Sequence, residues 1–496
     1  MRAKGSITVM LSLVLLLMLS LLFTLLESAR VRGLQADADR MTQAAAESVF
    51  AEYSRALLED YDLFALDGGY GTDTFSADNA AARMMTFLAW NAEETDGSGA
   101  MQIDFFQAEP QSVQLEAWQL LTDEEGAAYY QMACSYAQSA LPAAVLSSLA
   151  SYLMGGDASD EVQEDDSLAV LEEALDALEE EDSYGEEENA ELTEEEIAAA
   201  EAVSEETKGI LETVSELKTK GILTLLTGDV SGLSAQTLSA EVLYTDRTAE
   251  SGTGVWIQGD GSRLLFQWYL GEKFTSFLDT DGEEDHALQY ELEYCYAGND
   301  SDTENLECVA ERILLIREGI NFAYLLTDTQ KQAEAKIVAL AIAGVFAVPA
   351  ILSMVQYAVL AAWAFLEAVR DVQILLAGDA LPAVKTAQNW QTDLSISSLT
   401  ESGTGASGGL TYENYLQILL LTCSEEELIS RSLNLIEQNV RLTDGNEAFQ
   451  VDHCITAASW ETVWSADPMF LSLTAFGAQS GIGIYGFVSE GTFRYE

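Results

Sequence analysis

The chain has 496 residues, of which 48% are hydrophobic, so it is long enough for two or three modules with a sizeable core. Only 22 lysines and arginines stand against 83 aspartates and glutamates, which gives a net charge of −61. Nucleic-acid binding requires clustered basic side chains, so this balance argues against a nucleic-acid partner and is typical of an acidic, outward-facing surface.

The N-terminus carries two basic residues, Arg2 and Lys4, before an uncharged apolar run from Gly5 to Leu26. A helix needs roughly 20 apolar residues to cross a bilayer, whereas a cleaved signal peptide has roughly 7–15. We therefore predict a single-pass cell-membrane protein that contacts the lipid bilayer through this helix. Arg30 and Arg32 follow the run, so the orientation with the N-terminus inside is chosen because it makes the large acidic C-terminal part extracytoplasmic.

We expect the same helix to continue beyond the membrane. Residues 27–62 contain no proline, and their apolar residues recur at steps of three and four, as on one face of a helix. This spacing predicts one helix from Ser6 to about Tyr61, roughly 80 Å long at 1.5 Å per residue, which Gly68 and Gly69 end. Residues 1–68 are accordingly interpreted as a membrane anchor and stem helix.

Three segments are predicted after the stem. Residues 69–156 have a mostly helical pattern. Residues 157–206 are too acidic to bury enough apolar surface for folding alone, so they are interpreted as a partly helical linker, with cation binding as the alternative. Residues 207–496 are expected to form an α+β body. The predicted fold class is thus α+β, with a long N-terminal transmembrane or pilin-like helix before a mixed helical and antiparallel-sheet extracytoplasmic body.

Antiparallel strands are predicted in the first part of the body. In residues 226–297, β-branched and aromatic residues alternate with polar ones in TGVWIQ, RLLFQWYL and ALQYELEYCY, and GDGS and DTDGEED provide turns. Later patterns predict further elements, which are helices at 305–328, 412–422 and 425–442 and strands near 454–464 and 481–496.

A second uncharged run, Ile337–Leu366, is also long enough to span a membrane. It is rich in alanine and is interrupted by Pro349 and Gln356, and its flanking charges give no orientation bias. The run is interpreted as a buried helical hairpin bent at Pro349. A second membrane span stays open as the alternative.

Residues suited to catalysis are sparse. The two histidines, His286 and His453, lie in an acidic turn and in FQVDHCITA, where structural roles explain them better than proton transfer. Asp452 and Cys454 flank His453, but adjacent residues on a strand point to opposite faces. The loop GTGASGGL lacks the GK[ST] of a phosphate-binding loop. We therefore predict no enzyme activity, no catalytic or metal-binding residues and no cofactor.

One acidic segment has the spacing of a calcium-binding loop. The residues at the ligand positions of an EF-hand count are Asp300, Asp302, Glu304 and Glu311. Asn305 occupies the position where that loop requires glycine. The same residues are explained by Ser301 or Asp302 as the N-cap of the helix that follows, and this interpretation is preferred.

The cysteines are few for a chain of this length and odd in number, which argues against a disulfide framework. A single disulfide between Cys295 and Cys308, or between Cys423 and Cys454, is one interpretation. Buried free thiols are the other. The five cysteines are Cys134, Cys295, Cys308, Cys423 and Cys454.

The N-terminal sequence KGSITVMLSLVLLLMLSLLFTLLESARVRGLQADADRMTQAAAESV resembles the amino termini of TadE/TadG-like proteins of tight-adherence (Flp) pilus loci. In that family a short basic leader ends in glycine, and a hydrophobic helix and an alanine-rich helix follow. The resemblance implies leader cleavage between Gly5 and Ser6. Later segments, including RALLEDYDLFALDGG, ERILLIREGINFAYLLTD and NVRLTDGNEAFQVDHCIT, are similar to an uncharacterised group of large proteins in Gram-positive loci of this type.

One position departs from the family pattern. Pilin-like subunits carry glutamate at the fifth mature residue, where it neutralises the terminal amine of a neighbouring subunit, but here that residue is Met10. The resemblance therefore implies a pilin-like or accessory subunit that assembles, anchors or caps a tight-adherence pilus or related secretion apparatus, with proteins of that apparatus as partners. The alternative is a signal-anchored extracytoplasmic binding or sensing module unrelated to pili.

Overall fold

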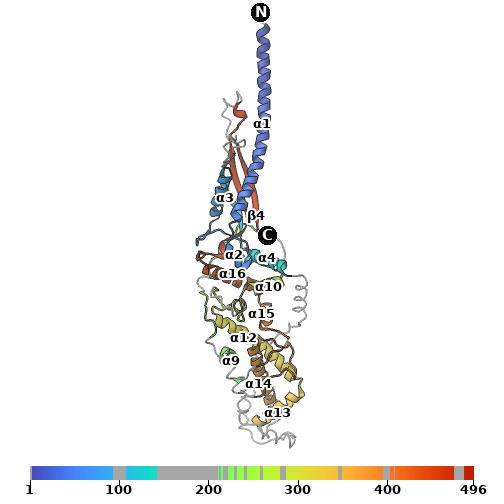
Figure 1. Cartoon of the computed structure of the whole chain (residues 1–496). Coiled ribbons are helices and arrows are strands. Elements are labelled where there is room, and N and C mark those ends of the chain that lie inside the picture. The colour runs from blue at the N-terminus through green and yellow to red at the C-terminus, as the bar shows by residue number, and fades with distance from the viewer. Residues whose placement is uncertain are drawn as a thin grey trace. The chain divides into compact units, whose positions relative to one another are not determined.

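The computed structural model describes residues 3–92, 108–141, 211, 214–215, 222–227, 232–239, 243–256, 261–279, 286–343, 349–394, 403–406, 408–473 and 485–495. The predicted acidic linker at 157–206 lies outside these residues. The chain forms two compact units (Figure 1). Unit 1 comprises Met1–Ala140, Glu241–Tyr269 and Ser432–Glu496, and unit 2 comprises Leu141–Ala240 and Leu270–Arg431. Helices accompany an antiparallel sheet, so the predicted α+β class is confirmed.

Unit 1 combines a long helix with a small sheet. Its helices are α1 (Ala3–Phe50), α2 (Arg55–Tyr61), α3 (Ala77–Ala92) and α4 (Asp123–Ala140). Its strands are β1 (Leu66–Asp67), β2 (Ala108–Leu120), β3 (Cys454–Ala466) and β4 (Tyr485–Arg494). Helices α10 (Arg263–Lys273) and α16 (Glu425–Leu442) include residues of both units.

Strand β3 is the centre of the sheet, and every described strand pairs with it in the antiparallel direction. On one side, β2 pairs along its length, from Ala108 opposite Ala466 to Leu120 opposite Ile455. On the other side, β4 pairs with Ala457–Ala466, and the short β1 pairs with the start of β3. The strands predicted near 454–464 and 481–496 are confirmed as β3 and β4.

Helices α1 and α3 cover one face of this sheet. The buried side chains of α1 between Ala38 and Phe50 recur at helical spacing and pack against Trp460 and Trp464 of β3. Phe50 also stacks on Phe493 of β4, with ring centroids 4.3 Å apart. Figure 1 shows the C-terminal half of α1 lying along the sheet, so this half of the helix is part of the core of unit 1.

The continuous stem helix is shorter than predicted, because α1 ends at Phe50 and α2 is a separate helix. Ser54 is the N-cap of α2, and its hydroxyl oxygen accepts a hydrogen bond from the Leu57 N–H. A serine N-cap provides an acceptor for an N–H group of the first helical turn that would otherwise have no partner. It therefore favours the start of a new helix over the continuation of the previous one. Asp62, at a left-handed φ of 53°, ends α2 in the role predicted for the glycines at 68 and 69.

Unit 2 consists mainly of helices among its described residues. They are α9 (Leu223–Thr227), α11 (Glu291–Ala297), α12 (Asp302–Leu325), α13 (Thr329–Ala343), α14 (Pro349–Leu376) and α15 (Tyr412–Leu420). Helix α14 packs against both α12 and α13. The helices predicted at 305–328, 412–422 and 425–442 are confirmed as α12, α15 and α16.

The second apolar run contributes to two helices that pack against each other, α13 and α14. Pro349 is the first residue of α14, a position where its missing N–H has no intrahelical partner to lose. Large side chains such as Trp363 and Phe365 are fully buried. The described part of the run therefore has the predicted hairpin arrangement, although α14 also has the length and apolar composition of a membrane span.

The secondary-structure predictions were wrong at three places. Segment RLLFQWYL lies in α10, where Phe266, Tyr269 and Leu270 are buried at helical and not alternating spacing. Segment ELEYCY belongs to α11, whose first five residues are all buried, so its pattern carries no period. Segment TGVWIQ was predicted as a strand, but its described residues, 253–256, are not in one. Strand β2 lies within residues 69–156, in the same segment as helices α3 and α4, and register shifts near Ser112 and Ala117 interrupt its alternation.

A buried hydrogen bond between α1 and the sheet gives a test of this packing. The indole N–H of Trp464 donates to Thr42 Oγ1 at 3.2 Å, and both side chains are buried. Thr42→Val keeps the shape and removes the acceptor, so we expect it to lower the free energy of unfolding by about 1–3 kcal/mol. The measurement is thermal unfolding of the full chain in detergent.

Two further variants serve as controls. Thr42→Ser retains the hydroxyl and should lose less stability than Thr42→Val. In the double variant Thr42→Val/Trp464→Phe neither partner of the bond remains, so its destabilisation should be smaller than the sum of the two single changes. Strict additivity would show that the bond does not couple helix and sheet.

Candidate functional site

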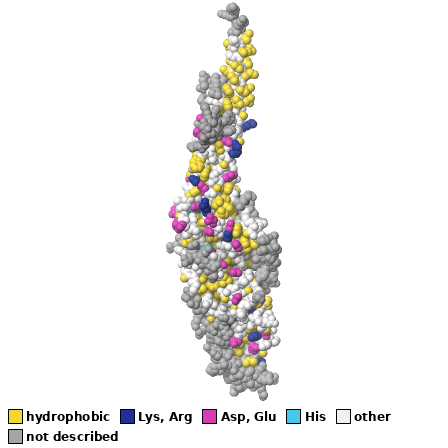
Figure 2. Space-filling model, in the orientation of Figure 1, with side chains coloured by type: hydrophobic (Ala, Val, Ile, Leu, Met, Phe, Trp, Pro, Cys, Tyr) yellow, Lys and Arg dark blue, Asp and Glu magenta, His cyan; other side chains and the backbone are white. Residues whose placement is uncertain are grey.

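The stretch of α1 from Ile7 to Leu26 is an apolar surface that other parts of the described chain leave largely uncovered. No side chain from Ile7 to Leu26 is buried, and Leu11 and Leu17 are about 70% exposed. Figure 2 shows hydrophobic side chains covering this end of the helix. The helix is long and apolar enough to cross a membrane. Contiguous apolar surface of this size marks a membrane or protein contact, so this stem is the leading candidate functional element of the described chain.

The residues at the predicted leader junction lie inside this helix. Gly5 and Ser6 belong to α1, and Met10 is 68% exposed among the apolar side chains that follow. Leader cleavage between Gly5 and Ser6 stays a prediction. The Met10 side chain is uncharged, so it can lie in lipid without a partner of opposite charge.

The apolar run ends at a buried ion pair. Glu27 and Arg30 are about 2% and 1% exposed, and their side chains meet at 2.9 Å. Glu27 also accepts hydrogen bonds from the backbone N–H groups of three consecutive residues, Met469, Phe470 and Leu471. Arg30 donates to the Asp467 carbonyl oxygen at 2.9 Å. We call Glu27 and Arg30 the clamp, because they hold the turn Asp467–Leu471 against α1.

Aromatic residues lie on the stem side of the clamp. Phe23, one helical turn before Glu27, stacks on Phe470 with ring centroids 6.4 Å apart and planes 18° from parallel. Tyr485, the first residue of β4, lies close enough to feel both charges of the clamp; burial and Glu27 raise the pKa of its phenol, whereas Arg30 lowers it. Tyr485 pairs with Ala466, the residue before the turn, so this end of the sheet carries an aromatic residue next to the turn.

Unit 2 contains a second buried charge cluster, on α14 and its neighbours. Lys385 Nζ lies 2.5 Å from Glu367 and 2.8 Å from Asp371. Arg317 of α12 bonds the other oxygen of Asp371 at 2.9 Å and also bonds Tyr415 of α15. All four charged side chains are buried, two acidic and two basic. The cluster is therefore neutral overall and joins α12, α14 and α15 to the residues around Lys385.

This cluster explains how α14 carries charge within an apolar helix. Its carboxylates face protein partners and not lipid, and Glu367 is further bonded by the backbone N–H groups of Gln391 and Thr392. A buried carboxylate with these partners is characteristic of a protein core. In unit 2, α14 has the environment of a core helix.

A third group of carboxylates, in unit 2, accepts hydrogen bonds from backbone N–H groups of nearby loops. Glu291 bonds the Thr275 N–H, Glu293 bonds the Phe277 N–H, and Asp302 bonds the N–H groups of Gln289 and Tyr290. These bonds account for the burial of all three acids. Burial raises the pKa of Glu293 to about 7, although the Tyr412 hydroxyl donates to it and opposes this shift.

The preferred N-cap interpretation of the acidic segment is confirmed. Ser301 caps α12 and accepts a hydrogen bond from the Glu304 N–H. Asp302 is engaged by backbone donors and by Ser234, and not by the other residues of the supposed calcium loop. Among the described residues, no group of three or more His, Cys, Asp or Glu side chains could hold a metal ion.

The two histidines contact neighbouring side chains within the fold, and the cysteines form no disulfide among the described residues. His286 Nδ1 lies 3.1 Å from Glu291, and His453 is buried beside the ring of Phe75. Asp452 binds Arg247 and not His453. The short 3-10 turn Val451–His453 precedes β3, so these residues are not yet on the strand as predicted. All five cysteines are free thiols.

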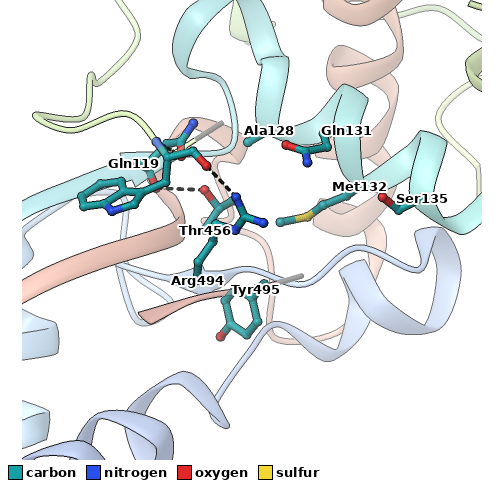
Figure 3. Close-up of a pocket in the computed structure, with 9 residues that line it drawn as sticks. Gln119, Ala128, Gln131, Met132, Ser135, Thr456, Arg494 and Tyr495 are labelled. Carbon is teal, nitrogen blue, oxygen red and sulfur yellow. Dashed lines mark hydrogen bonds between the residues drawn. The ribbon is translucent and has the colours of Figure 1, made fainter. Parts of the chain in front are cut away.

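A small cavity of about 220 Å³ lies in unit 1 between α4, the sheet and Trp256 (Figure 3). Arg494 donates to the Trp256 carbonyl oxygen at 2.7 Å, and Gln119 accepts from the Trp256 N–H at 3.0 Å. None of the nine lining residues has a carboxylate, imidazole or thiol that could act as a general base. They are Gln119, Ala128, Gln131, Met132, Ser135, Trp256, Thr456, Arg494 and Tyr495.

Sequence reasoning found the stem but missed the clamp. The signal was present, since the first charges after the apolar run, Glu27 and Arg30, are spaced for contact on one helix face. Nothing in the sequence linked them to Asp467–Leu471, more than 400 residues later. The charges at 367 and 371 were interpreted only as flanking charges of the apolar run, because nothing in the local sequence pairs them with Arg317 and Lys385.

Comparison with known protein families matches most of the second half of the chain and a short stretch before it. The model of a family described as "Family of unknown function (DUF5702)" matches residues 200–466, more than half of the chain. This range includes β3 and the described helices of unit 2, and it begins after α1–α4. No curated protein and no solved structure matches.

The cluster on α14 predicts a strong dependence on Lys385. Lys385→Met leaves Glu367 and part of Asp371 buried without their cation, so we expect a loss of about 3–5 kcal/mol in the free energy of unfolding. Lys331→Met is the matched control, because Lys331 lies over the Trp363 ring and pairs with a partly exposed glutamate. The control should lose about 1 kcal/mol or less. Equal losses in chemical denaturation would show that the cluster is not a buried charge network.

Glu293 predicts a pH dependence of stability. The folded state holds its proton up to a pKa of about 7, whereas the ordinary value is 4.5. Its stabilising contribution is therefore present below pH 4.5 and is lost as pH rises through about 7. Glu293→Gln removes this loss, so its Tm should exceed that of the native chain at about pH 8 and approach it at about pH 5. A constant difference between these pH values would contradict the prediction.

Proposed function

We propose a function for this chain, which belongs to the family of unknown function DUF5702: it is a membrane-anchored, pilin-like or accessory subunit. In this role it assembles, anchors or caps a tight-adherence pilus or related secretion apparatus. The proposal rests on one observation above others, namely the division of α1 into an uncovered apolar half and a half packed on an antiparallel sheet.

The two halves of α1 suit a subunit that stands on a membrane. The uncharged stretch Ile7–Leu26 is roughly 30 Å long at 1.5 Å per residue, close to the thickness of the hydrocarbon core. Its apolar side chains contact lipid or the stems of other subunits, where packing drives association. The half from Leu34 onward is fixed to the sheet, so the body is carried on the stem without a flexible joint at that point.

Charge supports an outward-facing body. The net charge of −61 disfavours contact with anionic lipid surfaces and nucleic acid. The N-terminal side of the stem has two basic residues within its first four positions. We therefore assign the body to the extracytoplasmic side, with proteins of the apparatus as its partners.

Met10 favours an anchoring or capping role within this proposal. A glutamate in the hydrocarbon core costs a few kcal/mol unless a neighbouring subunit neutralises it. With methionine, the stem is stable in lipid as an isolated helix and does not require a filament neighbour. The subunit is therefore expected to stay in the membrane and not to polymerise.

Mechanical shearing of cells tests this function. The native protein should remain in the membrane fraction and co-isolate there with assembly proteins of the apparatus. Met10→Glu should move part of it into sheared filaments, because the glutamate can pair with a neighbouring terminal amine. Met18→Glu is the matched control, since Met18 is equally exposed on the stem, at 65% against 68%, but lies two turns further along. This control should not enter filaments.

Three results would count against the proposal. Abundant native protein in sheared filaments would replace the anchoring role with that of a structural pilin. Membrane-bound protein that never co-isolates with assembly proteins would favour a signal-anchored binding or sensing module. Recovery of the native chain in the soluble fraction would remove the membrane anchor itself.

A further inference from the structure

We propose that the turn Asp467–Leu471 is a lipid-contacting collar, which lies in the interfacial region of the bilayer with Met469 and Phe470 against lipid. This inference rests on the membrane-anchored stem of the proposed function. It adds a second membrane contact, made by a segment that is far from the stem in sequence. The partner is the bilayer that already surrounds the stem.

The depth of the turn follows from its contacts with α1. Phe470 stacks on Phe23, which lies four residues before Glu27 and therefore about 6 Å further along the helix toward the membrane. Phe23 belongs to the uncharged stretch, whereas Glu27 is the first charged residue after that stretch. If this stretch spans the hydrocarbon core, the ring of Phe470 reaches the boundary between acyl chains and headgroups.

The turn is compatible with that depth because three of its backbone N–H groups are hydrogen-bonded and Pro468 has none. An N–H group without a partner is costly in an apolar medium, so irregular backbone is normally excluded from lipid. Here Glu27 accepts from the N–H groups of Met469, Phe470 and Leu471. Arg30 neutralises this carboxylate and is itself bonded to the Asp467 carbonyl oxygen. The clamp thus supplies the hydrogen-bond acceptors that water would provide for these N–H groups at an exposed turn.

The side chains also match an interface. Met469, Phe470 and Leu471 are half-buried, Asp467 is exposed, and Tyr485 pairs with Ala466, the residue before the turn. Aromatic residues with a polar neighbour are enriched at the level of lipid headgroups. The apolar surface of the stem continues without a charge up to this turn, so the same lipid can cover both.

Photo-crosslinking in vesicles tests the collar. A benzophenone amino acid replaces Phe470, Leu16 or Val488 in separate full-length proteins, which are reconstituted into vesicles of fluorescent phosphatidylcholine. Zwitterionic lipid is chosen because the acidic body would be repelled by anionic headgroups. Leu16 reports on the stem, and Val488, which is 49% exposed on β4, is the exposed control away from the turn.

We expect lipid adducts at positions 16 and 470 and a severalfold lower yield at 488. Adducts at 16 without adducts at 470 would overturn the collar and leave the stem intact. Equal adducts at 470 and 488, or crosslinks from 470 to a second copy in place of lipid, would also overturn it. Absence of adducts at 16 would overturn the membrane stem itself, and with it both proposals.

A change in the clamp separates lipid contact from simple exposure. Glu27→Gln keeps the side-chain shape but replaces the charged acceptor of the three N–H groups and the partner of Arg30. The lipid adduct at 470 should fall severalfold, while the adduct at 16 stays unchanged. Asp37→Asn is the control, because Asp37 forms its ion pair with the exposed Arg40 further along α1. An unchanged adduct at 470 in Glu27→Gln would show that the clamp does not place the turn, and the inference would fall.

Discussion

The Glu27–Arg30 clamp marks the point at which α1 passes from one environment to another. Before it, none of the side chains from Ile7 to Leu26 is buried, although Phe23 stacks on Phe470; after it, the apolar side chains of the helix pack under a sheet. A charged pair at this point would be costly in lipid and weak in water, but here it is buried and bonded to the backbone of a distant turn. The clamp thereby joins the end of the stem to the turn that follows the central strand β3, and the proposed membrane position depends on it.

Unit 2 also contains buried ion pairs, and there they allow an apolar helix to carry charged side chains inside the protein. Helix α14 passes the length and composition test for a membrane span, yet it holds Glu367 and Asp371 against Lys385 and Arg317. Hydropathy averages over these positions and cannot register that each charge has a partner elsewhere in the chain. Two helices of similar apolar length therefore have opposite surroundings, since the stem of α1 is uncovered and α14 is mostly buried.

The sequence was most informative where one face of an element is buried. The amphipathic helix α16 and the alternating strand β3 were predicted close to their observed bounds, whereas the helix that carries the apolar stem was predicted to reach about Tyr61 and ends at Phe50. Prediction failed where burial has no period, as in α11, where a strand is irregular, as in β2, and where a short polar cap decides the outcome, as at Ser54. At the candidate site, the stem and Met10 could be found from local sequence. The turn at 467–471 could not, because nothing local predicts a contact with Glu27.

The position of β3 has a consequence for the synthesis of the chain. The strand at the centre of the sheet is formed by Cys454–Ala466, near the end of the chain, whereas β1, β2 and the helices that cover them come from the first 120 residues. Those early segments emerge with an apolar face and unpaired strand edges that cannot be covered until residues 454–466 have been made. The residues of unit 2 form a block that can fold during this interval. We therefore expect the nascent chain to depend on holding factors at the membrane, and late truncations to leave an aggregation-prone N-terminal half instead of a shortened but working protein.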